Sequence, residues 1–160
     1  MAGVQYPGSC FISSNSGGSW SLLSAPLSTN KYYSAVVMDS AGLNIFVASY
    51  SGYIYRSTNS GFSFTSSAQN GEWYSLACSS QGQYIIGVQS PGQIWLSQDL
   101  GNSWVEVYGV SSNTWYAVCM SRNGRYVTAA LNGGGIYRSS NFGIANSWYY
   151  YNSYLLFFLK

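Results

Sequence analysis

Charge is nearly absent from this sequence of 160 residues. Only 6% of the residues are charged, against about 25% in ordinary globular domains. A net charge of +2 neutralises few phosphates, which argues against nucleic acid as a partner. The sequence also has no histidine, and histidine is both the usual proton carrier near neutral pH and the commonest zinc ligand. We therefore expect no metal site and no cofactor.

Cysteine and long apolar runs are scarce as well. Three cysteines are too few for a disulfide scaffold, and no CxxC spacing suggests a metal knuckle. The N-terminus lacks the pattern of a signal peptide. The most apolar segment, residues 154–159, is far shorter than the roughly 20 residues that span a bilayer. These features favour a soluble protein without a membrane span, in the cytoplasm or in a virus particle.

Aromatic residues are abundant, at 18% of the chain, and four similar segments recur along it. We call residues 13–20, 57–64, 97–104 and 139–148 the box segments. Their leading serines are 44, 40 and 42 residues apart. Each contains an Asx residue, a glycine two positions later and a closing aromatic residue. These are Asn15, Gly17 and Trp20; Asn59, Gly61 and Phe64; Asp99, Gly101 and Trp104; and Asn141, Gly143 and Trp148.

The sequence between the box segments predicts β-strands. Short runs of β-branched and aromatic residues alternate with turns rich in Ser, Asn and Gly, and no stretch has a helical period. Four strands in about 42 residues form one blade of a β-propeller. A β-sandwich has a similar density of strands but does not predict such a regular period. We therefore predict an all-β propeller of about four four-stranded blades.

The box segments resemble the Asp-box, or bacterial neuraminidase repeat, of sialidase-like propellers. In that family the box forms the hairpin between the third and fourth strands of a blade. Its Asx side chain accepts backbone hydrogen bonds, its glycine takes a positive φ, and its tryptophan is buried between blades. This sequence departs from the pattern through three asparagines, Phe64 and two extra residues before Ser147. Asparagine can form the same turn, but the lost charge argues against calcium in the boxes.

The repeat also predicts how the chain is divided. We expect a single domain, 1–160, with a half-blade at 2–32, blades at 33–73, 74–115 and 116–153, and a closing strand at 154–160. Such a chain forms either a small closed ring or a partial propeller completed by a partner. In both cases we expect residues 154–160 to be buried as an innermost strand, beside the N-terminal half-blade or inside a neighbouring subunit.

The resemblance raises a sialidase-like hydrolase as one function. An active sialidase implies three arginines that grip a carboxylate, a Tyr–Glu nucleophile pair and an acidic proton donor, and glycosidases need two carboxylates about 5 to 10 Å apart. Asp39, Asp99 and Glu106 are expected in turns or beside a box segment. Only Glu72 is expected on the face opposite the boxes, without an acidic partner. We therefore predict that the protein is not an enzyme.

Aromatic residues suggest a second function, carbohydrate binding. Tyr32, Trp73, Trp115 and Tyr50 are expected at the mouth of the face opposite the boxes, where exposed rings can stack on sugars. The alternative is that these rings pack the core, to which we also assign Tyr33, Tyr74 and Tyr116. Isolated soluble domains normally carry enough surface charge to repel one another. Because this sequence has so little charge, it favours a non-catalytic structural or protein-interaction module. It would assemble with a protein partner or with itself, for example in a virus particle.

Overall fold

The computed structural model describes residues 1–5, 8–23, 27 and 31–151. Within these residues every regular element is a β-strand, and no helix is long and apolar enough to cross a bilayer. The strands form four antiparallel sheets, each with its strands in chain order. The sheet prediction is therefore confirmed. The predicted closing strand, residues 154–160, lies outside the described residues.

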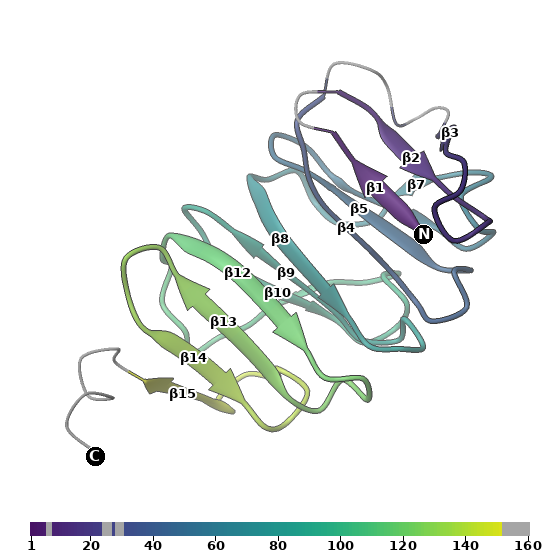
Figure 1. Cartoon of the computed structure of the whole chain (residues 1–160). Helices are drawn as coiled ribbons and strands as arrows, with labels where there is room; N and C mark the ends of the chain where they lie inside the picture. Colours follow the sequence, from purple (N-terminus) through teal and green to yellow (C-terminus); the bar gives the residue numbers. More distant parts are fainter. Residues whose placement is uncertain (6–7, 24–26, 28–30, 152–160) are drawn as a thin grey trace, which may run out of the picture.

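The strands of each sheet are short and follow one another directly (Figure 1). The first sheet contains β1 (Ala2–Val4), β2 (Cys10–Ile12) and β3 (Ser21–Leu22). The second contains β4 (Tyr33–Met38), β5 (Ile45–Ser49), β6 (Ile54–Ser57) and β7 (Thr65–Ser66). The third contains β8 (Trp73–Cys78), β9 (Ile85–Gln89), β10 (Ile94–Ser97) and β11 (Val105–Glu106). The fourth contains β12 (Trp115–Met120), β13 (Val127–Leu131), β14 (Ile136–Ser139) and β15 (Trp148–Tyr151).

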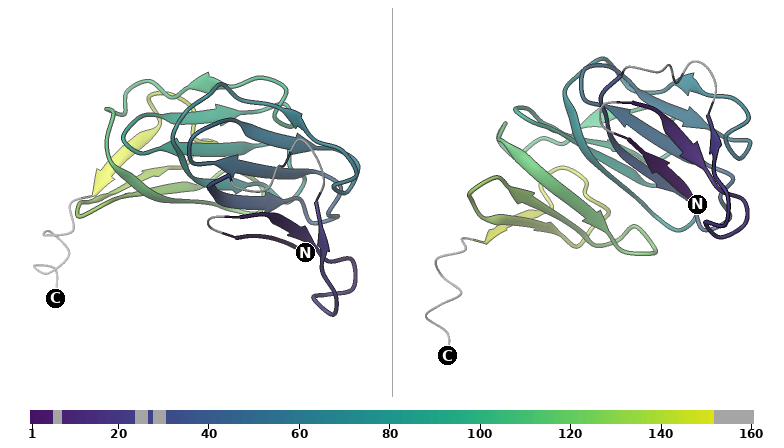
Figure 2. Two further views of the ribbon diagram at one scale, coloured as in Figure 1. Left: turned by 90° about the horizontal axis from the view of Figure 1, so that it is seen from above. Right: turned by 45° about the horizontal axis from the view of Figure 1, so that its top comes forward.

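The four sheets pack face to face in chain order, like successive blades of a β-propeller. The opening strands β4, β8 and β12 lie beside one another on the inner side of the arc. Figure 2 shows the first sheet at one end of this arc and the fourth sheet at the other. In the described residues the two end sheets do not meet, so the alternative of a small closed ring is wrong. The predicted partial propeller agrees with the structure.

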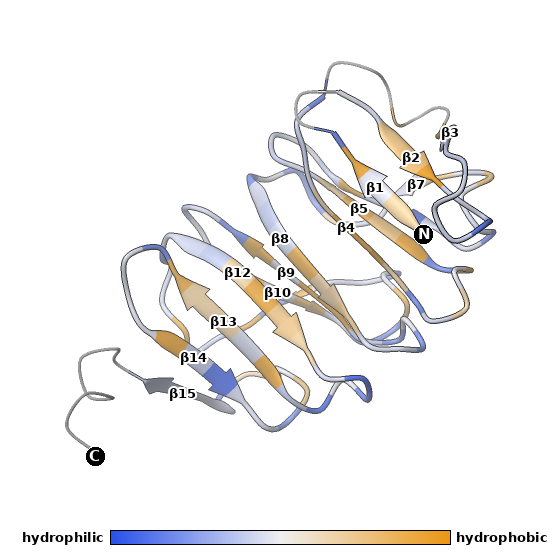
Figure 3. Ribbon diagram, in the orientation of Figure 1, coloured by the Kyte–Doolittle hydropathy of each residue, from blue (hydrophilic) through white to orange (hydrophobic). Residues whose placement is uncertain are grey.

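Both faces of a middle sheet are buried, which explains the continuous apolar runs of the second strands. All five residues of β5 are buried. Ile45 and Val47 pack toward the first sheet, while Phe46 and Ala48 pack toward the third. Hydrophobic residues accordingly concentrate on the strands and hydrophilic residues on the turns (Figure 3). A strand between two sheets therefore carries a continuous run of apolar side chains, as Ile45–Ala48 do in β5.

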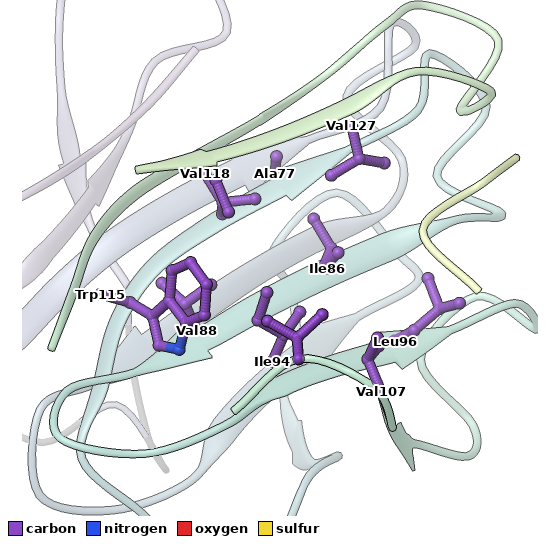
Figure 4. Packing of buried hydrophobic residues seen from close by; sticks show 11 residues of the cluster. Ala77, Ile86, Val88, Ile94, Leu96, Val107, Trp115, Val118 and Val127 are labelled. Atoms are coloured by element: carbon purple, nitrogen blue, oxygen red, sulfur yellow. The ribbon is translucent and has the colours of Figure 1, made fainter. Parts of the chain in front are cut away.

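Three hydrophobic clusters lie between neighbouring sheets. Figure 4 shows the cluster between the third and fourth sheets, with side chains from both pointing toward one another. Its members include Ala77, Ile86, Val88, Ile94, Leu96, Val107, Trp115, Val118 and Val127. Backbone hydrogen bonds add to this packing. The amide of Ser40 donates to the carbonyl of Ser80, and the amide of Ser80 donates to that of Arg122, each over 2.8 Å.

Candidate functional site

The four box segments lie in the hairpins between the last two strands of their sheets. In three of them the Asx Oδ1 atom accepts a hydrogen bond from the backbone amide four residues later. The distances are 2.8 Å at Asn15, 3.0 Å at Asn59 and 2.9 Å at Asp99. The inward orientation predicted for these three side chains agrees with this geometry.

The serine that opens each box segment is buried and holds the turn from inside. Ser97 donates its hydroxyl to Asp99 Oδ1 over 2.9 Å and accepts the amide of Gly101 over 2.8 Å. The residue before each box glycine has a left-handed backbone, with φ between 55° and 61°; these residues are Ser16, Ser60, Leu100 and Phe142. The turn is thus defined by a small hydrogen-bond network that leaves its polar groups satisfied.

Asn141 is the exception, and its predicted orientation is wrong. Within the described part of the chain its side chain makes no hydrogen bond. The hydroxyls of Ser139 and Ser147 instead lie 2.6 Å apart. The two extra residues of this box segment lengthen the loop, and Asn146 takes a second left-handed conformation with φ of 59°. Ser147 therefore does not present its amide to Asn141.

The glycines and aromatic rings of the box segments attach each sheet to the preceding one. Trp104 Nε1 donates over 3.0 Å to the hydroxyl of Ser67, which follows β7 of the second sheet. Phe64 is buried in the cluster between the first and second sheets. Trp20 is 46% exposed, because no sheet precedes the first in the described residues. These aromatic residues are structural.

Trp73 and Trp115 are wrongly expected at an exposed mouth. Both are 0% exposed and belong to the inter-sheet clusters. Trp73 Nε1 donates to Gln69 O over 3.2 Å, and Trp115 Nε1 donates to Gly92 O over 3.1 Å. A buried indole with its one donor satisfied offers no surface to a ligand. Of the four aromatic residues predicted to bind ligands, only Tyr32 and Tyr50 remain at least partly accessible.

The expected core positions of Tyr74 and Tyr116 are also wrong, because both side chains are exposed, whereas Tyr33 is buried as expected. A β-bulge follows the first residue of β4, β8 and β12, so the second residue leaves the strand alternation. Tyr33, Trp73 and Trp115 therefore share one buried position, and Ser34, Tyr74 and Tyr116 share the next, which faces outward.

Two of these bulge residues, Tyr74 and Tyr116, form a row of rings with Tyr50, which follows β5. The ring centroids of Tyr50 and Tyr74 are 6.2 Å apart with planes at 66°, and those of Tyr74 and Tyr116 are 5.8 Å apart. The row stops at Ser34, which has no ring. A groove of about 530 Å³ lies there, lined by Val4, Tyr33, Ser34, Tyr50 and Tyr74. Sequence reasoning expected Tyr50 at the mouth but missed this groove, because it placed Tyr74 in the core together with Tyr33.

The carboxylates serve turns or lie apart from one another. Buried Asp39 accepts the amides of Leu43 and Asn44 over 2.9 and 3.2 Å. At Asp99, burial raises the carboxyl pKa, but hydrogen bonds from Ser103, Ser97 and the Asn102 backbone outweigh it and lower the pKa. Glu72 precedes β8, and Glu106 ends β11. In the described residues no three His, Cys, Asp or Glu side chains form a metal-binding group.

One arginine, Arg56, lies in the second sheet, and the other three lie in the fourth sheet or its turns. Arg56 Nη1 donates to Asn102 Oδ1 in the next sheet over 2.5 Å. Arg125 and Arg138 lie over the ring of Tyr126, at 5.7 and 5.5 Å from its centroid. Arg122 lies in the turn between β12 and β13. Arg122 and Arg138 line two different grooves, so they do not share a pocket as the arginines of an active sialidase would.

The outer face of the fourth sheet is the largest departure from the repeated packing. Ile54, Ile94 and Ile136 hold the same position in successive sheets, because they pair with Ala48, Val88 and Ala130. Ile54 is 0% exposed and Ile94 is 1% exposed, but Ile136 is 40% exposed. In the part of the chain that the structure describes, no further sheet covers this face.

Polar and aromatic residues flank Ile136 on that face. Arg138, Ser140, Tyr149 and Tyr151 line a shallow groove of about 200 Å³. Cys119 is exposed on β12, whereas burial raises the pKa of Cys10 to about 12, and burial with the charge of Asp39 raises that of Cys78 to about 11. Cys119 is therefore the accessible thiol of the three.

The fold is similar to that of solved β-propeller proteins. An ancestral GH74 enzyme matches with a TM-score of 0.70 and 25% identity, over 90% of this chain and 21% of that chain. A GH74 enzyme from Niastella koreensis matches with a TM-score of 0.72 and 18% identity, over 91% and 26%. YCF48 bound to D1 peptide matches with a TM-score of 0.61 and 13% identity, over 94% and 42%.

The chain thus spans between about a fifth and two fifths of these proteins. The open arc of four sheets therefore matches a part of each of these larger chains. The sequence matches no protein-family model and no curated protein.

Proposed function

We propose that this protein is a non-catalytic interaction module built from Asp-box repeats, and that it binds a protein partner through the outer face of the fourth sheet. The observation that carries the proposal is the exposure of Ile136 at a position that is buried in the second and third sheets. The equivalent faces of those sheets are each covered by the next sheet. We therefore expect the occupant to be a further blade-type β-sheet, carried by the partner.

The backbone supports the same occupant. The amides of Ser40 and Ser80 each donate to a carbonyl in the next sheet. Arg122 holds the corresponding place in the fourth sheet. Its backbone amide is therefore in position to donate the next hydrogen bond of this series to an added sheet. The face presents the apolar or aromatic side chains of Ile136, Tyr149 and Tyr151 beside the polar Arg138 and Ser140, and burying its apolar surface favours association. YCF48, which has the same fold, has been solved with a bound peptide.

The non-catalytic part of the proposal rests on the carboxylates. Asp39 and Asp99 accept hydrogen bonds that hold their own turns. Glu72 precedes β8 and Glu106 ends β11, and these two strands form opposite edges of the third sheet. Glycosidase chemistry requires two carboxyl groups close together on one substrate. We expect no turnover of a fluorogenic sialoside. Turnover that disappears in the Glu72→Gln variant would show that the protein is a hydrolase.

The interaction surface can be tested with Ala130→Arg, which places a charge at the centre of the face. Gln81→Arg adds the same charge in an exposed turn of the third sheet and serves as the control. Sedimentation of the purified chain over a range of concentrations first measures self-association. A photo-crosslinker attached to Cys119 then identifies other protein partners, and their binding to the unlabelled chain is measured in the same way. We expect the bound partner, or a second copy, to protect Cys119 from maleimide.

We expect Ala130→Arg to abolish both association and protection, and Gln81→Arg to preserve them. Association that leaves Cys119 fully reactive, or that persists in Ala130→Arg, would exclude the fourth sheet as the interface. A melting temperature for each variant separates lost binding from lost folding.

A further inference from the structure

We propose that the groove beside Ser34 is a binding site for a neutral saccharide, independent of the protein-binding face. Its described lining consists of Val4, Tyr33, Ser34, Tyr50 and Tyr74, and it measures about 530 Å³. That volume lies within the usual range for small-molecule sites, roughly 300 to 1,000 Å³. The site exists because one position of the repeat carries a small residue where two others carry a ring.

The repeat shows how the groove arises. Ser34, Tyr74 and Tyr116 are the bulge residues of β4, β8 and β12. In the third and fourth sheets the bulge carries a tyrosine, and the two rings contact each other at 5.8 Å. In the second sheet the bulge carries Ser34 instead, and the ring that contacts Tyr74 from that sheet is Tyr50, which follows β5. The groove lies beside Ser34, with Tyr50 and Tyr74 in its lining.

The walls favour a ligand with both apolar and hydroxylated surfaces. The rings of Tyr50 and Tyr74 meet at 66°, so they form two adjoining walls rather than one flat platform. A sugar ring can place its C–H face against one aromatic face, which carries partial negative charge, and direct hydroxyls toward tyrosine and serine oxygens. Val4 adds an apolar contact. This combination of apolar lining with a few polar groups is typical of small-ligand sites.

Charge limits the class of ligand further. None of the described lining residues is charged, so an anionic sugar such as a sialic acid has no cation there to pair with its carboxylate. The Ser34 hydroxyl donates to the carbonyl of Trp73 over 2.7 Å. Its oxygen therefore keeps lone pairs that can accept a hydrogen bond from a sugar hydroxyl. The geometry points to an uncharged oligosaccharide.

The site can be tested by calorimetric titration of the full chain with soluble cellotetraose, mannotetraose and chitotetraose, and with sialyllactose as an anionic comparison. The informative variant is Ser34→Tyr, which installs the residue that the repeat itself carries at this position and fills the groove. Tyr74→Ala removes one wall instead. Tyr108→Ala removes an exposed ring that follows β11 and is the matched control.

We expect at least one neutral oligosaccharide to bind, with affinity about tenfold weaker or more in Ser34→Tyr and Tyr74→Ala, and with unchanged affinity in Tyr108→Ala. Melting temperatures confirm that each variant is folded, and Tyr50→Ala replaces any variant that is not. Absence of binding by all three neutral probes, binding of sialyllactose alone, or binding that Ser34→Tyr leaves unchanged would overturn the proposal.

Discussion

A Cβ atom on Gly101 would lie 2.9 Å from the ring of Phe46, although the two residues belong to different sheets. This contact couples the box turn of the third sheet to the buried face of the second. It has a direct consequence for stability. Gly101 combines a φ of +79° with a neighbour too close for any side chain, so two separate effects oppose substitution there.

The first prediction separates these two effects. Gly42 has a φ of +71° with nothing within 4 Å of a built Cβ atom. Gly42→Ala should therefore cost only the left-handed backbone, about 1–2 kcal/mol. Gly101→Ala should cost about 1–3 kcal/mol more through overpacking. Urea denaturation of both variants measures the difference, and equal losses would show that Phe46 moves aside freely.

The second prediction concerns neighbouring aromatic residues on β12. Trp115 is fully buried and Tyr116 is 58% exposed. Trp115→Ala should lower the free energy of unfolding by about 3–5 kcal/mol. Tyr116→Ala should lower it by about 1 kcal/mol or less, because it loses mainly its contact with Tyr74. The reverse order in thermal or urea denaturation would restore the original assignment of the tyrosine to the core.

The third prediction concerns pH and Asp99. Its pKa is lower in the folded protein than in the unfolded chain, so its contribution to stability is present above about pH 4. That contribution disappears as the pH falls through the folded pKa. In Asp99→Asn this acid-dependent loss should be smaller, while the turn persists as it does at Asn15 and Asn59. Unfolding free energies from pH 2 to 6 test this, and identical curves would contradict it.

The fourth prediction concerns the buried serine of a box segment. Ser97 accepts the amide of Gly101, and that amide is buried. Ser97→Ala should cost about 1–3 kcal/mol, because the amide loses its acceptor without gaining water. Ser103→Ala, which removes an exposed hydroxyl from the same turn, should cost less. Hydrogen exchange at the Gly101 amide gives a second measurement, and unchanged protection in Ser97→Ala would contradict the assigned role.

The fold could be predicted because the repeat period, the apolar runs and the turn residues all indicate the same structure. The spacing of the box segments indicates a unit of about 42 residues, and the apolar runs indicate strands buried on both faces. Turn residues such as Asn59 and Gly61 have local roles that a sequence motif records. The burial of Phe64 follows from the same pattern.

The inner tyrosines could not be placed by strand alternation, because a bulge interrupts it between the first and third residues of β4, β8 and β12. The spacing does contain the correct register. Tyr33, Trp73 and Trp115 each lie 24 residues before the serine that opens the following box segment. Alignment by tyrosine identity instead shifts the second sheet by one residue. The groove at Ser34 was missed through this shift.

The separation of the core into three layers has a further consequence. Each layer is shared by only two neighbouring sheets, so stability is approximately a sum of terms between nearest neighbours, as in other repeat proteins. Adding or removing one unit at an end changes one layer and leaves the others intact. Duplication or loss of a unit of about 40 residues is therefore tolerated without redesign of the remaining interior, and such chains can vary in length more freely than proteins with a single core.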